Sequence, residues 1–263
     1  MKHIMVIAGT KDARDIAGEL IKIKADVLAT VTTGYGRELL EEFPGVRVHE
    51  GKLDPAGITG LVRRDNISCI VDASHPFARE VSTNAIRSCE ETGIAYLRFE
   101  RKKASAEGNA AIRVKSFEEA AEAAGKFEGN ILLTIGSNHI NAFTKSIPDY
   151  KTRLYARILP DSRMVAKCEE AGLSAGNIIA IKGPFSEELN IEMLKYCRAA
   201  VMVAKESGET GGTEQKLDAA VKLGLPVILV ERPDIKYPQM VSTIDEVVEF
   251  VNKRILQEKD NVR

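Results

Sequence analysis

The first residues of the chain constrain its fold most strongly. An apolar run over residues 4–8 stops at Gly9. After a polar turn, Ile16, Leu20 and Ile23 follow at the spacing of one helix face. This order predicts a strand, a tight loop and a helix. Such a loop presents backbone N–H groups at the start of a helix, where the helix dipole favours an anion, and phosphate is the usual one.

The glycine in this loop has two interpretations. Gly9 is followed by no other glycine before Gly18, so the dinucleotide-binding fingerprint G-x-G-x-x-G is absent. Gly9 either begins a loop that binds phosphate or only allows a parallel strand to turn into its helix. The loop by itself leaves both interpretations open.

Strand-like and helical segments alternate along the whole chain, which is typical of parallel sheets covered by helices. Short apolar runs that predict strands lie at residues 26–32, 46–49, 67–71, 94–98, 131–135, 153–158, 178–181, 199–204 and 226–230. Helix starts are indicated by Asp54 before Pro55 and by capping boxes at Ser116 and Thr243. The polar segment 101–109 is the expected linker. We therefore expect two α/β domains of similar design, over residues 1–103 and 110–263.

Composition restricts the classes of function. The chain has 263 residues, of which 44% are hydrophobic, enough for two cores, and its net charge of −1 argues against a general nucleic-acid or membrane binder. No apolar run approaches the roughly 20 residues of a membrane span, and no signal peptide is visible, so we expect a cytoplasmic protein. The four cysteines form no C-x-x-C pair and the four histidines lack ligand spacing, so we expect reduced thiols and no bound metal.

Cations follow successive strands of the second half. In open α/β sheets, ligands bind beyond the carboxyl ends of the strands. Those ends carry Arg157, Lys182, Lys205 and Arg232. One such residue would be explained by a solvated loop, but four predict a concave site for a ligand with several carboxylates or phosphates. The glycine-rich stretch 207–216 adds Lys216; it lacks the G-K-[ST] ending of a P-loop, so it predicts either an anion-binding loop or a mobile surface loop.

The end of the second predicted strand points to a phosphorylated nucleotide. A typical NAD site has an acid there that binds the ribose hydroxyls, whereas this chain has Thr33 and Gly34, with Arg37 just after. Hydroxyls and a cation suit a ribose 2′-phosphate, so NADPH is favoured over NADH. The alternative is an ordinary turn followed by a solvated arginine.

The segment 72–78 contains a second candidate for chemistry. Asp72 and His75 are too close in sequence to presume a proton relay, and no G-x-S-x-G elbow is present. His75 is a candidate general acid or a residue that lines a ligand cleft. Alternatively, it only caps the following helix.

Taken together, these stretches resemble the precorrin-6A reductase family of corrin (vitamin B12) biosynthesis, over nearly the whole chain. The resemblance rests on Ala8-Gly9-Thr10 with Arg14, on segments 31–36, 72–78, 157–160 and 183–186 with Asn190, and on segments 205–208, 211–212, Glu214, Lys216 and 232–233. Two positions depart from the family pattern: Ala13 stands where glycine is frequent, and Glu206 where aspartate is common.

The resemblance implies a fold and a reaction. The fold would be two Rossmann-like domains with parallel sheets and an active-site cleft between them, the first binding the nicotinamide cofactor and the second completing the substrate site. The reaction would be hydride transfer from NADPH or NADH to precorrin-6A or cobalt-precorrin-6A, giving the 6B form. That tetrapyrrole carries many acetate and propionate arms, which would explain the cations at the strand ends.

We therefore predict two sets of site residues. The predicted cofactor-binding residues are Gly9, Thr10, Arg14, Thr33, Gly34, Tyr35, Arg37, Ser74 and His75. The predicted substrate-binding residues are Arg157, Lys182, Gly183, Ser186, Lys205, Ser207, Gly208, Gly211, Gly212, Lys216 and Arg232. Lys205 and His75 are the predicted catalytic residues, as alternative proton donors, although water or a substrate carboxyl group would also serve.

Two other functions stay open at this point. One is another nicotinamide-dependent Rossmann reductase or epimerase, although Tyr96 and Tyr155 lack the lysine four residues later that such enzymes commonly use. The other is a non-catalytic sensor of a nucleotide or metabolite. The sequence leaves open whether the macrocycle carries cobalt and whether the chain is a monomer or a weak homo-oligomer.

Overall fold

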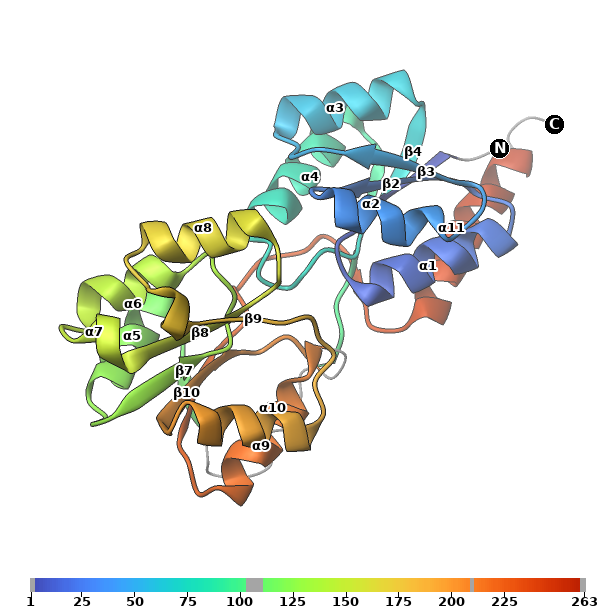
Figure 1. Cartoon of the computed structure of the whole chain (residues 1–263). Coiled ribbons are helices and arrows are strands. Elements are labelled where there is room, and N and C mark those ends of the chain that lie inside the picture. The colour runs from blue at the N-terminus through green and yellow to red at the C-terminus, as the bar shows by residue number, and fades with distance from the viewer. Residues whose placement is uncertain (1–2, 103–110, 209–210, 261–263) are drawn as a thin grey trace. The chain divides into compact units, whose positions relative to one another are not determined.

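The computed structural model describes residues 3–102, 111–208 and 211–260 of the chain, which divides into two compact units (Figure 1). The first unit contains Met1–Lys102 and Pro233–Arg263, and the second contains Lys103–Arg232. Of the helices within the described ranges, none combines the length and the apolar character needed to cross a membrane.

The first unit is a six-stranded parallel sheet in the order β12-β5-β4-β1-β2-β3. Its strands are β1 (His3–Ile7), β2 (Asp26–Val31), β3 (Val46–Glu50), β4 (Ile67–Asp72), β5 (Ala95–Phe99) and β12 (Met240–Val241). Its helices are α1 (Lys11–Lys22), α2 (Gly34–Glu41), α3 (Pro55–Arg64), α4 (Arg79–Thr92) and α11 (Ile244–Asp260).

Alternate residues of β1 pack into two separate hydrophobic cores, because successive side chains of a strand point to opposite faces of the sheet. Ile4 and Val6 pack in the core that α1 and α11 cover, and these two helices lie together in Figure 1. Met5 and Ile7 pack in the core that α3 and α4 cover. Both faces of the sheet are therefore buried, and its edges are left for ligands.

The second unit is also a six-stranded parallel sheet, in the order β6-β11-β10-β7-β8-β9. Its strands are β6 (Ala111–Val114), β7 (Asn130–Leu133), β8 (Leu154–Ile158), β9 (Ile178–Ala180), β10 (Ala199–Lys205) and β11 (Val227–Val230). Its helices are α5 (Phe117–Gly125), α6 (Ile140–Ser146), α7 (Tyr150–Arg153), α8 (Ser162–Glu170), α9 (Glu187–Tyr196) and α10 (Thr213–Lys222). The helices α9 and α10 pack together over one core of this sheet.

The expected fold class, two α/β sheets of parallel strands, is confirmed. The helix caps expected at three positions are present, because the side chains of Asp54, Ser116 and Thr243 accept the N–H groups of Gly57, Glu119 and Glu246. Two further helices begin at residues that the structure identifies. The Thr33 hydroxyl accepts the Gly36 N–H, so α2 begins at Gly34, and α10 begins at Thr213.

The end of the chain requires a correction of the expected domain division. Residues 110–263 were expected to form one domain, but β12 pairs with β5 and extends the first sheet. Val247 and Val251 on α11 have no exposed surface and pack in the core beside α1. The physical reason is that β12 provides hydrogen-bond partners for the outer edge of β5, and α11 covers apolar residues on the same face of the sheet as α1. Both contacts join segments that are far apart in the sequence, so no local pattern predicts them.

The start of the second unit also differs from expectation. The strand β6 was not expected, because its two middle residues are exposed, its two end residues are only half-buried, and the segment gives a weak apolar signal at the sheet edge. The expected linker, residues 101–109, lies outside the described residues from position 103 onward.

Candidate functional site

A glycine turn joins β1 to α1 at the carboxyl edge of the first sheet. Gly9 has a φ angle of 125°, in the left-handed region that favours glycine. Chain neighbours aside, nothing among the described residues lies within 4 Å of the position that a Cβ on Gly9 would take. The Thr10 hydroxyl accepts the Ala13 N–H (3.1 Å) and donates to the Ala73 carbonyl (2.9 Å), which fastens the turn to the end of β4. The turn therefore offers backbone N–H groups at the start of a helix of 12 residues.

The corresponding turn of the second sheet has a different form. The strand β7 has the same place in its sheet as β1 has in the first. Gly136 after β7 also has a positive φ angle (78°), but α6 begins only at Ile140 and has 7 residues. The His139 ring before α6 stacks on the Phe117 ring, with 3.7 Å between the ring centroids. Of these two turns, the one after β1 is suited to a phosphate.

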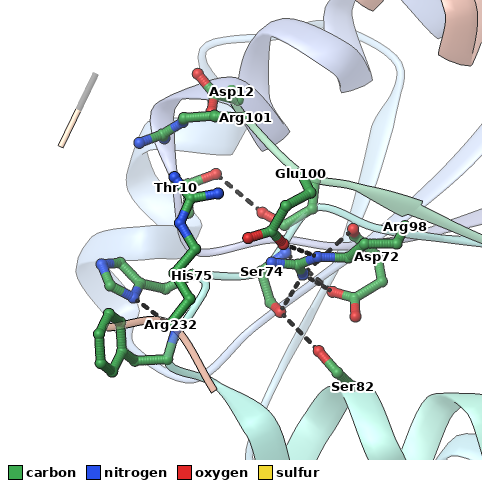
Figure 2. Close-up of polar contacts among 12 residues, drawn as sticks. Thr10, Asp12, Asp72, Ser74, His75, Ser82, Arg98, Glu100, Arg101 and Arg232 are labelled. Atoms are coloured by element: carbon green, nitrogen blue, oxygen red, sulfur yellow. Dashed lines mark hydrogen bonds and ion pairs between the residues drawn. The ribbon is translucent and has the colours of Figure 1, made fainter. Parts of the chain in front are cut away.

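Charged side chains of α1 and of the segment after β5 lie close to this first turn. Asp12, in the first turn of α1, forms an ion pair with Arg101, which follows β5. Arg14 is half-buried on the same helix. Figure 2 shows Asp12 and Arg101 together near Thr10. The negative charge of Asp12 at the helix N-terminus is thus balanced by an arginine.

Arg37 is occupied by carboxylates from two elements. Its guanidinium lies 3.3 Å from Glu50 at the end of β3 and 3.5 Å from Glu41 one turn along α2, and it donates to the Val48 carbonyl at 3.4 Å. Glu50 pairs in register with Val31, so an acid does lie beside the end of β2. Sequence analysis missed it because it belongs to the next strand. Because Glu41 and Glu50 are both negative and Arg37 is the one positive member, this group of three side chains carries a net negative charge.

Near this group, the remaining residues predicted for the same end of the cofactor have mixed roles. The Thr33 hydroxyl caps α2, and Gly34 begins that helix. The Tyr35 side chain is exposed. Thr33 is therefore engaged by the fold, whereas Tyr35 is accessible to a ligand.

The loop after β4 is held in a tight turn. The Nδ1 atom of His75 accepts the Phe77 N–H at 3.2 Å, so the His75 ring is half-buried and fixed by its own loop. The possible Asp72–His75 relay has no support in the contacts of Asp72, whose carboxylate binds the side chains of Tyr96 and Arg98 and the Ser74 N–H. His75 lies in the loop just beyond the end of β4.

A cluster at this edge, which we call the Arg98 bracket, consists of Asp72, Ser74, Tyr96, Arg98 and Glu100. Figure 2 shows Asp72, Ser74, Arg98 and Glu100 together, and the Tyr96 hydroxyl donates to Asp72 Oδ2 at 2.7 Å. Arg98 is 1% exposed and Asp72 is fully buried. The Nη1 atom of Arg98 donates to Asp72 Oδ1 (3.0 Å) and Ser74 Oγ (3.1 Å), and its Nε atom donates to Glu100 Oε2 (2.7 Å). Sequence analysis did not single out Arg98. The available signal was a charged residue inside an apolar strand.

The ionisation of this bracket follows from its contacts. Burial lowers the pKa of Arg98, but the negative charges of Asp72 and Glu100 more than compensate, and the net shift is upward. Burial and then the Asp72 charge raise the pKa of Tyr96. The bracket therefore keeps a charged arginine and a neutral phenol at physiological pH.

In the second unit, Arg157 near the end of β8 is held by neutral groups. Its Nη1 atom donates to Asn190 Oδ1 at 2.7 Å and contacts the Met193 sulfur at 3.3 Å, and its guanidinium lies 4.2 Å from the centroid of the Phe185 ring. Burial lowers its pKa to about 10, so it remains charged at neutral pH.

Lys216 interacts electrostatically with both Arg157 and Lys205, and we define these three residues as the cation cluster. Lys216 is 7% exposed, and its Nζ atom donates to the Gly211 carbonyl at 3.1 Å. Burial, followed by the positive charges of Arg157 and Lys205, lowers the pKa of Lys216 to about 7. Burial lowers the pKa of Lys205 to about 8. A bound anion would relieve this crowding of positive charge.

Arg232 has a different environment from the cation cluster. It forms a buried ion pair with Glu206, which also accepts the Gly208 N–H at 2.9 Å. The Ser207 N–H donates to the Thr213 hydroxyl at 3.1 Å, and the Ser207 hydroxyl donates to the Lys205 carbonyl at 3.2 Å. Arg232, Ser207 and Gly208 therefore build the turn after β10.

Of the remaining predicted substrate residues, Ser186 and Gly183 support the groups that hold Arg157. The Ser186 hydroxyl caps α9, and the Ser186 carbonyl accepts the Asn190 amide at 2.7 Å. A Cβ on Gly183 would stand 3.0 Å from the Phe185 ring, so glycine there lets that ring lie under the guanidinium. Lys182 is exposed. Gly212 has a φ angle of 67° immediately before α10, where a left-handed residue is needed.

No group of three or more potential metal ligands occurs within the part of the chain that the structure describes. The expectation that the protein binds no metal stays a prediction.

Comparison with known proteins assigns the chain to a family. The family described as "Precorrin-6x reductase CbiJ/CobK" matches residues 3–252. The chain belongs to this family. The cobalt-precorrin-6A reductase of Priestia megaterium is 42% identical over 246 residues, which cover 93% of this chain and 96% of that protein. The cobalt-precorrin-6A reductase of Methanothermobacter thermautotrophicus is 39% identical, covering 88% of this chain and 77% of that protein.

A precorrin-6x reductase has also been solved with this fold. The structure of CobK precorrin-6A reductase aligns over 96% of this chain and 97% of that one, with a TM-score of 0.77 and 25% identity. The precorrin-6A reductase of Rhodobacter capsulatus is 28% identical over 94% of this chain. The two six-stranded sheets are thus an arrangement known in this family.

The cation cluster of this precorrin-6x reductase generates a testable prediction. In a ¹³C NMR titration of reductively methylated lysines, Lys216 should lose its proton near pH 7 and Lys205 near pH 8. The variant Arg157→Met should raise the pKa of Lys216, because a positive neighbour that favours its neutral form is removed. Lys222, an exposed residue of the same helix, is the control: its pKa is raised from 10.5, mainly by its bond to Glu187. Titration of Lys216 near 10.5 would contradict the cluster.

Proposed function

We propose that this chain reduces cobalt-precorrin-6A to cobalt-precorrin-6B with a hydride from a reduced nicotinamide. The observation that carries the proposal is the cluster of buried Arg157 and Lys216 with half-buried Lys205, in a member of the precorrin-6x reductase family. A macrocycle with several carboxylate arms would bring negative charge to Arg157, which contacts Asn190 and Phe185, and to Lys216, which donates to the Gly211 carbonyl.

The relatives support the cobalt-containing substrate. Those named for cobalt-precorrin-6A are 31–42% identical to this chain, whereas those named for precorrin-6A are 28% and 29% identical. The chain therefore resembles the first group more closely. We infer that cobalt is in the ring before reduction.

The first unit has the features of a cofactor site. The Gly9 turn and the N-terminus of α1 would bind the cofactor phosphates, with Arg101 close by. The open space at Gly9 fits this role, because a side chain there would stand where a phosphate must approach. The exposed Tyr35 would contact the adenosine end. When bound, the reduced nicotinamide supplies the hydride, and the protein supplies orientation and electrostatics.

The second unit would bind and orient the macrocycle. Charge-assisted hydrogen bonds from Arg157 and Lys216 to carboxylate arms would fix the ring, and Phe185 would keep the Arg157 fork in place. Lys205, whose pKa is about 8, holds its proton at neutral pH and is our candidate proton donor to the reduced ring. His75 is the alternative donor, although its ring already accepts a hydrogen bond from its own loop.

The nucleotide preference follows from the charges around Arg37. The sequence favoured NADPH because Arg37 follows the second strand. Glu50 and Glu41 occupy that guanidinium, however, and their joint negative charge repels a 2′-phosphate. Glu50 is an acceptor suited to ribose hydroxyls. We therefore propose NADH as the preferred donor.

The proposed reaction is tested by a steady-state assay with cobalt-precorrin-6A and NADH. We expect one nicotinamide oxidised per macrocycle and a product heavier by two hydrogens. Lys216→Met should raise the KM for the macrocycle about tenfold or more, because a charge-assisted hydrogen bond contributes about 1.5–3 kcal/mol. The rise should be largest below pH 7, where wild-type Lys216 is protonated, and should shrink as pH rises and that charge is lost.

The matched control is Lys222→Met, which removes an exposed lysine from the same helix and should leave the KM for the macrocycle unchanged. A wild-type protein that oxidises neither NADH nor NADPH with this macrocycle refutes the reaction. An equal KM for Lys216→Met and wild type at pH 6 refutes the role of the cation cluster.

The nucleotide preference is tested by Glu50→Gln. This substitution removes one of the two negative charges beside Arg37, so the ratio of kcat/KM for NADPH to that for NADH should rise about tenfold. Glu42→Gln removes an exposed carboxylate from the far end of α2 and should leave the ratio near the wild-type value. A wild-type preference for NADPH, or a ratio that Glu50→Gln leaves unmoved, would contradict the proposed role of Glu50.

A further inference from the structure

The loop that carries His75 is attached to its surroundings mainly through Ala73 and Ser74. The Ala73 N–H donates to the Ile7 carbonyl at 3.1 Å, and the Ala73 carbonyl accepts the Thr10 hydroxyl at 2.9 Å. The Ser74 N–H donates to Asp72 Oδ1 at 3.0 Å. The loop after β4 is thus joined to the glycine turn after β1.

Arg98 completes this attachment from the other side. Asp72 and Arg98 are paired in register on β4 and β5, so their side chains emerge side by side. The same Nη1 atom of Arg98 reaches Asp72 Oδ1 (3.0 Å) and Ser74 Oγ (3.1 Å), and Ser74 Oγ lies 3.4 Å from Ser82 Oγ on α4. One guanidinium therefore joins the end of β4, its loop and, through Ser82, the next helix (Figure 2).

We propose that Arg98 is a positioning residue for hydride transfer, which acts through Asp72 and Ser74 to hold the His75 loop in register with the Gly9 turn. The proposal rests on the proposed nicotinamide-dependent reduction. If the Gly9 turn binds the phosphates of the cofactor, the distance between that turn and the His75 loop sets where the nicotinamide end lies. A displacement of about 1 Å at a reacting centre can cost about 100-fold in rate.

Stability alone gives a weak reason for such a bracket. A buried ion pair often stabilises a fold no more than well-packed apolar residues would, so its main effect is to specify one geometry. The bracket lies at the carboxyl edge, where ligands of parallel sheets bind. Its outer face is covered by Tyr237, whose ring lies 5.2 Å from the Arg98 guanidinium and stacks on Tyr96. The returning segment after residue 232 thus shields the bracket from water.

The test compares Ser74→Ala, Arg98→Lys and wild type in single-turnover reduction of cobalt-precorrin-6A by NADH. Ser74→Ala removes one hydroxyl without leaving a charge unpaired, and Arg98→Lys keeps the charge but loses the fork. We expect each to slow hydride transfer about tenfold to 100-fold while the KM for NADH changes less than about threefold, because the phosphate turn is intact. The deuterium isotope effect with 4-deuterated NADH should rise to its limiting value as hydride transfer becomes slower.

Controls separate positioning from loss of folding. The control is Arg47→Lys. Arg47 is an exposed residue of β3 in the same sheet and forms ion pairs with Asp26 and Asp65, so this substitution should leave the rate and the isotope effect at the wild-type values. The double variant Ser74→Ala/Arg98→Lys should be no slower than the slower single variant, because both act through one contact. If Arg98→Lys does not fold, Ser74→Ala and Tyr96→Phe decide the matter.

Wild-type rates in folded Ser74→Ala and Tyr96→Phe overturn the positioning role while leaving the reductase activity established. The positioning role is also overturned if Arg47→Lys slows hydride transfer as much as Arg98→Lys does, because a general loss of stability would then explain the effect. A wild-type protein that oxidises no nicotinamide overturns the proposed function, and the positioning role with it.

Discussion

A buried acid paired with a buried arginine fixes the carboxyl edge of each sheet. In the first unit Asp72 at the end of β4 pairs with Arg98 on β5, and in the second Glu206 after β10 pairs with Arg232 after β11. These strands hold equivalent places in the two sheets. A charge taken out of water must be compensated nearby, so each pair permits little freedom in the loop attached to it. The loops after β4 and β10, which would contact ligands, are therefore held in one geometry.

The two sheets share a strand order but are equipped for different ligands. After β1 a left-handed glycine leads directly into a helix of 12 residues, which suits a phosphate. After β7 the chain takes a wider turn into a helix of 7 residues. The second sheet instead collects Arg157, Lys205 and Lys216, and burial, followed by the positive charges of Arg157 and Lys205, lowers the pKa of Lys216 to about 7. This difference supports our proposal of a dinucleotide on the first unit and a polycarboxylate on the second.

Local patterns in the sequence were enough to predict most strands, several helix caps and the cations at the strand ends, because each is decided by neighbouring residues. Contacts between distant segments were not predictable in this way. The pairing of Asp72 with Arg98 depends on the register of two strands, and the approach of Glu50 to Arg37 depends on β3 lying beside β2. The return of residues 240–241 to β5 depends on an unfilled sheet edge. The ion pair of Arg232 with Glu206 likewise joins residues that follow two different strands.

Hydrogen–deuterium exchange with each ligand added alone tests the division between the two units most directly. NADH should slow exchange in residues 9–14 and 33–37 of the first unit, and cobalt-precorrin-6A should slow it in residues 182–190 and 211–217 of the second. Protection of the same unit by both ligands, or protection by NADH confined to the second unit, would contradict the account.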